Sequence, residues 1–191
     1  MHRRPLLALL DAHLVRWPED HVRVDHVRQF VRNHPDCFER TCVEGHVTGS
    51  AWIVSPDGGA VLLTHHRKLD RWLQLGGHAD GDPDVFAVAL REAREESGLE
   101  AFDVPQGDAG RRPLDVDVHV IPARGREPAH LHHDVRFLLI AAPGQRIAAS
   151  DESHDLRWIP LADLPRYSTE GSLLRMAERA PRLLATSPPR A

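Results

Sequence analysis

Three glutamates lie close together behind a loop rich in glycine and aspartate. The stretch from Gly76 to Glu100 reads GGHADGDPDVFAVALREAREESGLE and contains Glu92, Glu95 and Glu96. At helical spacing, like charges of this kind repel one another and reduce helix stability. A divalent cation would offset the repulsion, and Mg²⁺ or Mn²⁺ takes oxygen ligands and commonly bridges to substrate phosphates. The pattern therefore indicates a cation site, with a solvated charged helix face as the alternative.

Both ends of the predicted helix carry typical boundary residues. Aspartate accepts hydrogen bonds from the first unpaired helical amides, and proline is favoured at the first helical position, which Asp82 and Pro83 satisfy. Gly98 is a suitable stop just after the last turn. We therefore expect a helix over residues 83–97.

The three glutamates occupy the edge of the apolar side of this helix. At about 100° per residue, one face carries apolar side chains that must point to a core. These are Phe86, Ala89, Leu90 and Ala93. Glu92 and Glu96 fall on one flank of this face with Glu95 just beyond, whereas a solvated charged face would lie opposite the core. This placement favours the cation site.

The same stretch resembles the Nudix box, a motif of glycine, five residues, glutamate, seven residues and then Arg-Glu-apolar-x-Glu-Glu-x-Gly-apolar. Gly77 opens the motif, which covers 23 residues. Its second half is complete and consists of Arg91, Glu92, Ala93, Glu95, Glu96, Gly98 and Leu99. Pro83 takes the place of the first glutamate, and the neighbouring Asp80, Asp82 and Asp84 could supply a carboxylate there.

The resemblance implies an activity and a set of site residues. The activity is hydrolysis of a phosphoanhydride, a nucleoside diphosphate linked to another moiety, in which water attacks phosphorus with the help of Mg²⁺ or Mn²⁺. The metal ligands that it implies are the Gly76 carbonyl, Glu92, Glu95 and Glu96. Arg91 would orient the carboxylates by charge-assisted hydrogen bonds. Glu92 would add a ligand or position the attacking water.

Two later segments alternate polar and apolar residues with the period of a β-strand. In LDVDVHVIPA, the polar face carries Asp115, Asp117 and His119. In HLHHDVRFLLI, the polar face carries His130, His132, Asp134 and Arg136. If the two strands pair through the turn at residues 124–127, their polar faces form one surface that lines a cleft. A solvent-exposed sheet face is the alternative.

Several basic side chains are candidates for binding substrate phosphates. Lys68 is the single lysine of the chain, and a compact ammonium binds phosphate differently from a guanidinium. The full candidate set is Lys68, Arg67, His78, His119, His132 and Arg136. We expect His78, His119 and His132 to line the same cleft, as substrate contacts or as an auxiliary metal site. Glu152, on a loop before a later strand, is a further candidate catalytic residue.

The surrounding segments predict an α/β fold. Residues 4–33 show helical spacing in two blocks separated at Pro18, and strand-like segments follow. Strands, an inserted helix, more strands and a last helix near residues 170–184 are typical of an α/β/α sandwich on a mixed sheet, and the resemblance implies that this is the Nudix-like sandwich. We expect an N-terminal helical extension over residues 1–45, packed on the main domain rather than serving as a partner-binding hairpin. The hydrolase domain would span residues 46–191.

Composition limits the classes of function. The chain has 191 residues and a formal net charge of −4, which argues against a nucleic-acid binder. No run approaches the ~20 apolar residues of a membrane span, so a cytoplasmic protein without a membrane partner is expected. The 14 histidines include no helical HExxH motif, and Cys37 and Cys42 are expected to be reduced thiols. The expected partner is a small phosphoanhydride, and a homodimer is left open.

Two other functions share the expected fold. A prenyl-diphosphate isomerase would need a cysteine in the active-site region, whereas Cys37 and Cys42 precede the predicted sheet. A non-catalytic Nudix-like ligand-sensing module would be expected to lose box glutamates, which this chain keeps. The substrate and the number of metal ions stay open at this point.

Overall fold

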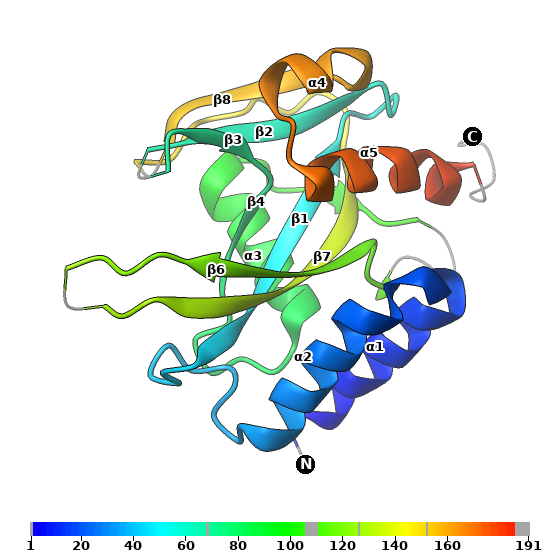
Figure 1. The fold of residues 1–191 in the computed structure, drawn as a ribbon. Coiled ribbons are helices and arrows are strands. Elements are labelled where there is room, and N and C mark those ends of the chain that lie inside the picture. Colours follow the sequence, from blue (N-terminus) through cyan, green and yellow to red (C-terminus); the bar gives the residue numbers. More distant parts are fainter. Residues whose placement is uncertain (1, 68, 106–110, 126, 152, 186–191) are drawn as a thin grey trace.

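The structure is a computed structural model of the chain, shown in Figure 1. It describes residues 2–67, 69–105, 111–125, 127–151 and 153–185. The helices are α1 (Arg4–Arg16), α2 (His21–Asn33), α3 (Val85–Ser97), α4 (Leu164–Tyr167) and α5 (Gly171–Leu184), with the 3₁₀ helices η1 (Pro18–Asp20) and η3 (Leu161–Asp163). The strands are β1 (Gly45–Val54), β2 (Ala60–His66), β3 (Arg71–Leu73), β4 (Leu75–His78), β5 (Phe102–Asp103), β6 (Asp115–Ile121), β7 (His130–Ala141) and β8 (Ser153–Pro160).

The predicted order of long helices and strands is confirmed, and helices cover both faces of a mixed sheet. The strand expected at residues 72–75 is instead two strands, because the chain leaves β2 after Leu73 and pairs with β1 from Leu75. β5 and α4 were not predicted, since segments of 2 and 4 residues carry no periodic signal. None of the helices in the described ranges combines the length and hydropathy that a membrane span requires.

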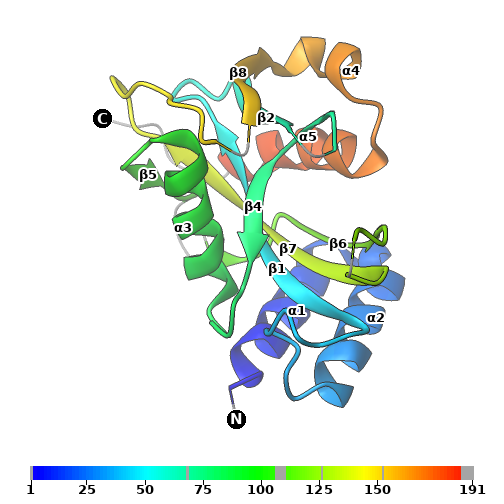
Figure 2. The ribbon, with the colours of Figure 1, turned by 90° about the vertical axis from the view of Figure 1, so that its left-hand side faces the viewer.

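The sheet is built around a parallel pair, β1 and β7, which lies at the centre of Figure 2. Gly45 pairs with Leu131 at one end of this ladder, and Val54 pairs with Ile140 at the other. The outer edge of β1 is shared by β4 and, near its end, by β2, while β6 and β5 share the outer edge of β7. One half of the sheet is therefore β4-β1-β7-β6, and the other half is β8-β2-β1-β7-β5, with β3 also paired to β2.

Side-chain alternation along β1 and β7 gives the sheet two differently covered faces. The first face packs under α1, α2 and α3 through Val47, Ala51, Ile53, Val135, Phe137 and Leu139. On the second face, α5 covers the half formed by the C-terminal ends of β1 and β7. It packs there against Trp52, Val54, Leu138 and Ile140. The remaining half of the second face carries polar side chains, and it forms the floor of a cleft.

The N-terminal helices belong to the core of the sheet. Val24, Val27 and Val31 of α2 are buried in one cluster with Val135 and Phe137 of β7. The extension therefore packs on the main domain, as expected, and its apolar side is used within the chain. The boundary between extension and hydrolase domain stays a prediction.

Helix α3 begins at Val85 and not at Pro83, so the predicted start is wrong. Asp84 is the N-cap residue, and its carboxylate accepts a hydrogen bond from the Ala87 amide at 3.1 Å. Asp82 in turn accepts from the Asp84 amide at 2.9 Å. Two successive aspartate turns therefore precede the helix, and Pro83 lies between them.

Candidate active site

The glutamates lie on a helix that is held close to the sheet. Helix α3 ends at Ser97 as predicted, with Gly98 in the left-handed conformation at a φ of 70°. Gly49 of β1 permits the close approach, because a Cβ there would lie 2.6 Å from the Val85 carbonyl oxygen. A side chain at this position would push α3 away from the strand, so the placement of the glutamates depends on Gly49.

Strand β4 runs beside α3 (Figure 2). The glycines of β4 make room for a carboxylate. A Cβ on Gly77 would lie 2.4 Å from the carboxyl carbon of Glu92, so Glu92 occupies the space that a side chain would fill. The Glu92 side chain is 13% exposed, whereas that of Glu95 is 60% exposed. Glu96 is half-buried. This gradient agrees with glutamates at the edge of the apolar face.

Arg91 contacts two of the carboxylates and the neighbouring strand. Its Nη1 lies 2.6 Å from Glu92 Oε1 and 3.4 Å from Glu95 Oε2. Its Nη2 donates a hydrogen bond to the His78 carbonyl oxygen at 3.0 Å. One guanidinium therefore ties α3 to β4, which is the position that an orienting role requires.

The glutamates line a cleft of about 850 Å³. Its walls come from α3, β4 and the β6–β7 hairpin, and its floor comes from β1 and β7. The lining contains these predicted site residues: Gly76, His78, Arg91, Glu92, Glu95, Glu96, His119 and His132. The three histidines expected beside the glutamates therefore share their cleft.

A buried aspartate, Asp134, holds the cleft floor together and is 2% exposed. Its Oδ1 accepts hydrogen bonds from the hydroxyls of Thr48 at 2.9 Å and Ser50 at 2.8 Å. Its Oδ2 accepts from the Gln74 amide at 3.2 Å and from Arg136 Nε at 2.7 Å. Both oxygens are satisfied by donors from neighbouring segments, so this part of the floor is fixed in place.

Arg136 lies within the floor and not among the residues that line the cleft. It is 3% exposed, and its guanidinium contacts Asp134, Asp115 and Asp117 at 2.7, 3.3 and 3.2 Å. Burial alone would lower the pKa of Arg136, but the three carboxylates raise it above its ordinary value. The structure therefore does not bring Arg136 together with the other candidate phosphate-binding residues. Its contacts are those of a residue that stabilises the floor.

Asp115 connects the floor to the helices. Its carboxylate lies 2.7 Å from Arg175 and 2.8 Å from Arg179, both on α5. Arg179 also contacts Asp20 of η1 at 2.7 Å. Burial alone would raise the pKa of Asp20, but hydrogen bonds from His13 and Arg179 hold it below its ordinary value. The solvent-exposed alternative for this polar face is wrong, because Asp115 is completely buried beneath α5.

Histidines form the next row of the floor. His46 of β1 pairs in register with His132 of β7, which pairs with His119 of β6. The Nε2 atoms of His46 and His132 are 3.1 Å apart, and the His78 ring centroid lies 4.8 and 5.0 Å from theirs. Burial, reinforced by neighbouring histidines, lowers the pKa to about 4 for His46 and His78 and to about 2 for His132. These rings are therefore neutral at pH 7.

Besides Arg136, three predicted site residues are not placed in the cleft lining. Arg67 is exposed, and its guanidinium donates to the Ser153 carbonyl oxygen at 3.3 Å. Lys68 and Glu152 lie outside the described residues, so their roles stay predictions.

Sequence reasoning missed His46, Thr48 and Ser50, which are the β1 part of the floor. Their period-two spacing at the start of the strand was available as a signal. It was obscured because residues 51–54 are apolar on both faces, where α3 and α5 cover the strand. A central strand covered on both faces shows a continuous apolar run instead of an alternation.

The donors on α3 and β4 fit a hard divalent cation. Glu92, Glu95 and Glu96 offer carboxylate oxygens to one cleft, and Gly77 leaves the Glu92 carboxylate unobstructed by a neighbouring side chain. Oxygen ligands of this kind suit Mg²⁺ and Mn²⁺. The histidines of the floor offer a second kind of donor, nitrogen, in the same cleft.

Comparisons with known proteins agree with this geometry. The family model described as NUDIX domain matches residues 45–184. A search of curated proteins found none that matches the sequence.

Solved structures confirm the fold expected from the sequence. An Ap4A hydrolase binary complex from C. elegans is 17% identical, with a TM-score of 0.57 over 73% of this chain and 97% of that one. The Nudix hydrolase RenU from M. smegmatis is 18% identical, with a TM-score of 0.53 over 76% of this chain and 89% of that one. A NUDIX-family hydrolase from Clostridium perfringens is 26% identical, with a TM-score of 0.52 over 72% and 97% of the two chains.

Proposed function

Because the chain belongs to the Nudix family, we propose that it hydrolyses a phosphoanhydride in which a nucleoside diphosphate is linked to another moiety. The observation that carries the proposal is one cleft that contains the three box glutamates, the glycines of β4 and Arg91. The proposed cofactor is Mg²⁺ or Mn²⁺. When bound, the ion would neutralise phosphate charge and lower the pKa of a water molecule.

The side chains on α3 and β4 have separate roles in this proposal. Glu95 and Glu96, together with the Gly76 carbonyl oxygen, hold the cation. Glu92 is mostly buried and positions the attacking water or adds a further ligand. Arg91 keeps the carboxylates in place, because it pairs with both Glu92 and Glu95.

Cationic side chains near the cleft are suited to substrate phosphates. Arg40 and Arg124 line the cleft, and Arg40 also pairs with Asp80 at 2.5 Å. We propose that Arg124 contacts a substrate phosphate, together with Lys68 and Arg67. The neutral histidines of the floor would supply hydrogen bonds to the rest of the substrate.

The cysteines do not favour a prenyl-diphosphate isomerase. Cys37 and Cys42 are buried, and the described residues that line the cleft include no cysteine. Burial raises the pKa of Cys37 to about 12, which disfavours a reactive thiolate. A non-catalytic ligand-sensing module is distinguished by turnover, since such a module would bind a phosphoanhydride without hydrolysing it.

A phosphate-release screen tests the proposed activity. Its substrates are nucleoside di- and triphosphates, nucleotide sugars, dinucleoside polyphosphates and ADP-ribose, each with Mg²⁺ and with Mn²⁺. On the best substrate, Glu95→Gln and Glu96→Gln should each lower kcat by about 100-fold, equivalent to about 3 kcal/mol of transition-state stabilisation. Glu100→Gln is the matched control, because Glu100 is exposed and lies beyond the end of α3. Near-wild-type turnover in both box variants, with unchanged metal affinity, would contradict the assignment.

The proposal extends to the setting of the protein. We expect it to act in the cytoplasm on a small molecule, without a nucleic-acid or membrane partner. Its parts would be the helical extension over residues 1–45 and the hydrolase domain over residues 46–191. Light scattering would show whether it forms a homodimer.

A further inference from the structure

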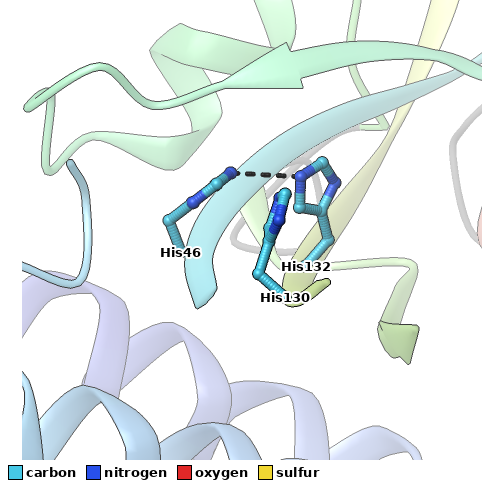
Figure 3. A group of neighbouring side chains, drawn as sticks. All are labelled: His46, His130 and His132. Atoms are coloured by element: carbon cyan, nitrogen blue, oxygen red, sulfur yellow. Dashed lines mark hydrogen bonds between the residues drawn. The ribbon is translucent and has the colours of Figure 1, made fainter. Parts of the chain in front are cut away.

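Three histidines, His46, His130 and His132, lie together (Figure 3), and two of them, His130 and His132, line the cleft that contains the box glutamates. His46 lies on β1, and His130 and His132 lie on the neighbouring β7. One ligand nitrogen from each ring lies within 4.8 Å of the other two, and the three rings point into one space. Three imidazoles with converging nitrogens are a common donor set for transition-metal ions.

The orientation of His130 is that of a metal ligand. Its Nδ1 lies 3.0 Å from the Pro128 carbonyl oxygen, which can only accept, so Nδ1 carries the proton and Nε2 has a lone pair. This Nε2 is buried and has no hydrogen-bond partner among the described residues. The side chain is 5% exposed. An unpaired buried nitrogen costs free energy, and metal-bound histidines typically donate their second nitrogen to a carbonyl in this way.

The Nε2 atoms of His46 and His132 face each other, and this contact does not use the full hydrogen-bonding capacity of the two rings. The Nε2 atoms are 3.1 Å apart, and a neutral pair can place only one proton between them. Nδ1 of His46 is also buried without a partner in the described part of the chain. A cation in place of the shared proton would bind both Nε2 lone pairs, and that proton would move to Nδ1 of the ring that carried it.

We propose that His46, His130 and His132 form a site for a transition-metal ion of the Zn²⁺ class, distinct from the carboxylate-held cation. Tetrahedral Zn²⁺ with Zn–N bonds of about 2.0–2.1 Å places its ligand nitrogens about 3.3 Å apart. His46 and His132 already have nearly this spacing, and the ligand nitrogen of His130 lies within 4.8 Å of theirs, so binding requires the His130 ring to move closer. His130 and His132 line the cleft, so the fourth position faces it and is open to water or a substrate oxygen.

The charges around the three histidines permit a bound cation. The positive charge of Arg40 helps to lower the pKa of His46, but Arg40 is itself paired with Asp80. On the other side, the Glu127 carboxylate lies 4.0 Å from Nε2 of His130. An ion here would join β1 to β7 and bring positive charge to the cleft.

A second group of side chains could compete for the same ions. Ligand atoms of His34, Asp36 and Cys42 also lie within 4.8 Å of one another. Burial raises the pKa of Cys42, which disfavours the thiolate that a metal needs. The histidine group binds through imidazole nitrogens and needs no thiolate, so it should fill first.

Titration of the full chain with Co²⁺ in excess Mg²⁺ tests the site without any substrate. Mg²⁺ occupies the carboxylates, while Co²⁺ held by nitrogen in tetrahedral geometry shows intense visible d–d bands. We expect about one such Co²⁺ per chain, displaced by Zn²⁺. Binding should be at least about tenfold weaker in His130→Asn and in His132→Asn. His154→Asn is the matched control, because His154 is exposed on β8, and Cys42→Ser should leave the spectrum unchanged.

Absence of tetrahedral bands in the wild-type protein overturns the proposal, whatever the variants do. Unchanged affinity in correctly folded His130→Asn and His132→Asn, checked by circular dichroism, also overturns it. A thiolate-to-cobalt charge-transfer band that Cys42→Ser abolishes assigns the ion to the second group instead. Because the readout is metal binding and not hydrolysis, failure of this site is distinguishable from failure of the proposed activity.

Discussion

Replacing Arg136 by methionine distinguishes a structural role for this residue from the substrate-binding role that the sequence suggested. The guanidinium is 3% exposed and contacts Asp134, Asp115 and Asp117. Methionine keeps much of the side-chain length but has neither the charge nor the donors. The variant therefore removes the ion pairs while it disturbs the packing of the floor as little as the chain allows.

The expected loss of folding stability in Arg136→Met arises mainly at Asp134. Asp115 and Asp117 keep their contacts with Arg175, whereas Asp134 loses the cation that balances its buried charge. Removing one partner of a buried ion pair costs about 3–5 kcal/mol, because the other charge stays desolvated. In a chain of this size about 1 kcal/mol corresponds to about 2–4 °C, so the Tm should fall by about 6–20 °C.

Urea unfolding followed by tryptophan fluorescence measures this loss in Arg136→Met and in the double variant with Asp134→Asn. The double variant has no unbalanced charge and keeps an oxygen that accepts from Thr48 and Ser50, so it should recover most of the lost stability. A different result would refute the reasoning. If Arg136→Met unfolds at the wild-type urea concentration and raises KM by about tenfold or more, the guanidinium contacts substrate.

Two further predictions concern a glycine and a buried histidine. Gly77→Ala should lower kcat by about 100-fold, because its Cβ would lie 2.4 Å from the Glu92 carboxyl carbon and displace that group. Gly171→Ala has no described atom within 4 Å of the added Cβ and should be neutral, and equal losses in both variants would contradict the packing argument. His133 stacks on Phe30, and burial lowers its pKa from 6.5 to about 3, so the unfolded chain takes up a proton first as the pH falls below 6.5. Between pH 7 and pH 5 the contribution of His133 should lower the free energy of unfolding by about 2 kcal/mol. His133→Phe should remove this part of the pH dependence, as measured by urea unfolding at several pH values. An unchanged pH dependence in the variant would contradict the prediction.

The parts of the site that could be predicted from the sequence depend on local periodicity. Glu92, Glu95 and Glu96 lie where helical spacing placed them, at the edge of an apolar face. The polar faces of β6 and β7 followed in the same way from period-two alternation. In both cases a few consecutive residues determine which side of an element faces the core.

The parts that could not be predicted depend on pairing between distant segments. His46 and His132 are 86 positions apart, and their contact follows from the parallel register of β1 and β7. The role of Arg136 was obscured for a similar reason. A polar strand face near a cleft reads as exposed, and only the packing of α5 shows that Arg175 and Arg179 cover part of it.

The ion pair between Asp20 and Arg179 has a consequence for the order in which the molecule is assembled. The two residues are 159 positions apart, near opposite ends of the chain. During synthesis, Asp20 leaves the ribosome early and stays hydrated until α5 follows. Asp115 likewise cannot pair with Arg179 until α5 has been made. Contacts of such long sequence separation form late in folding. The nascent chain therefore gains a finished cleft floor only after α5 has been made.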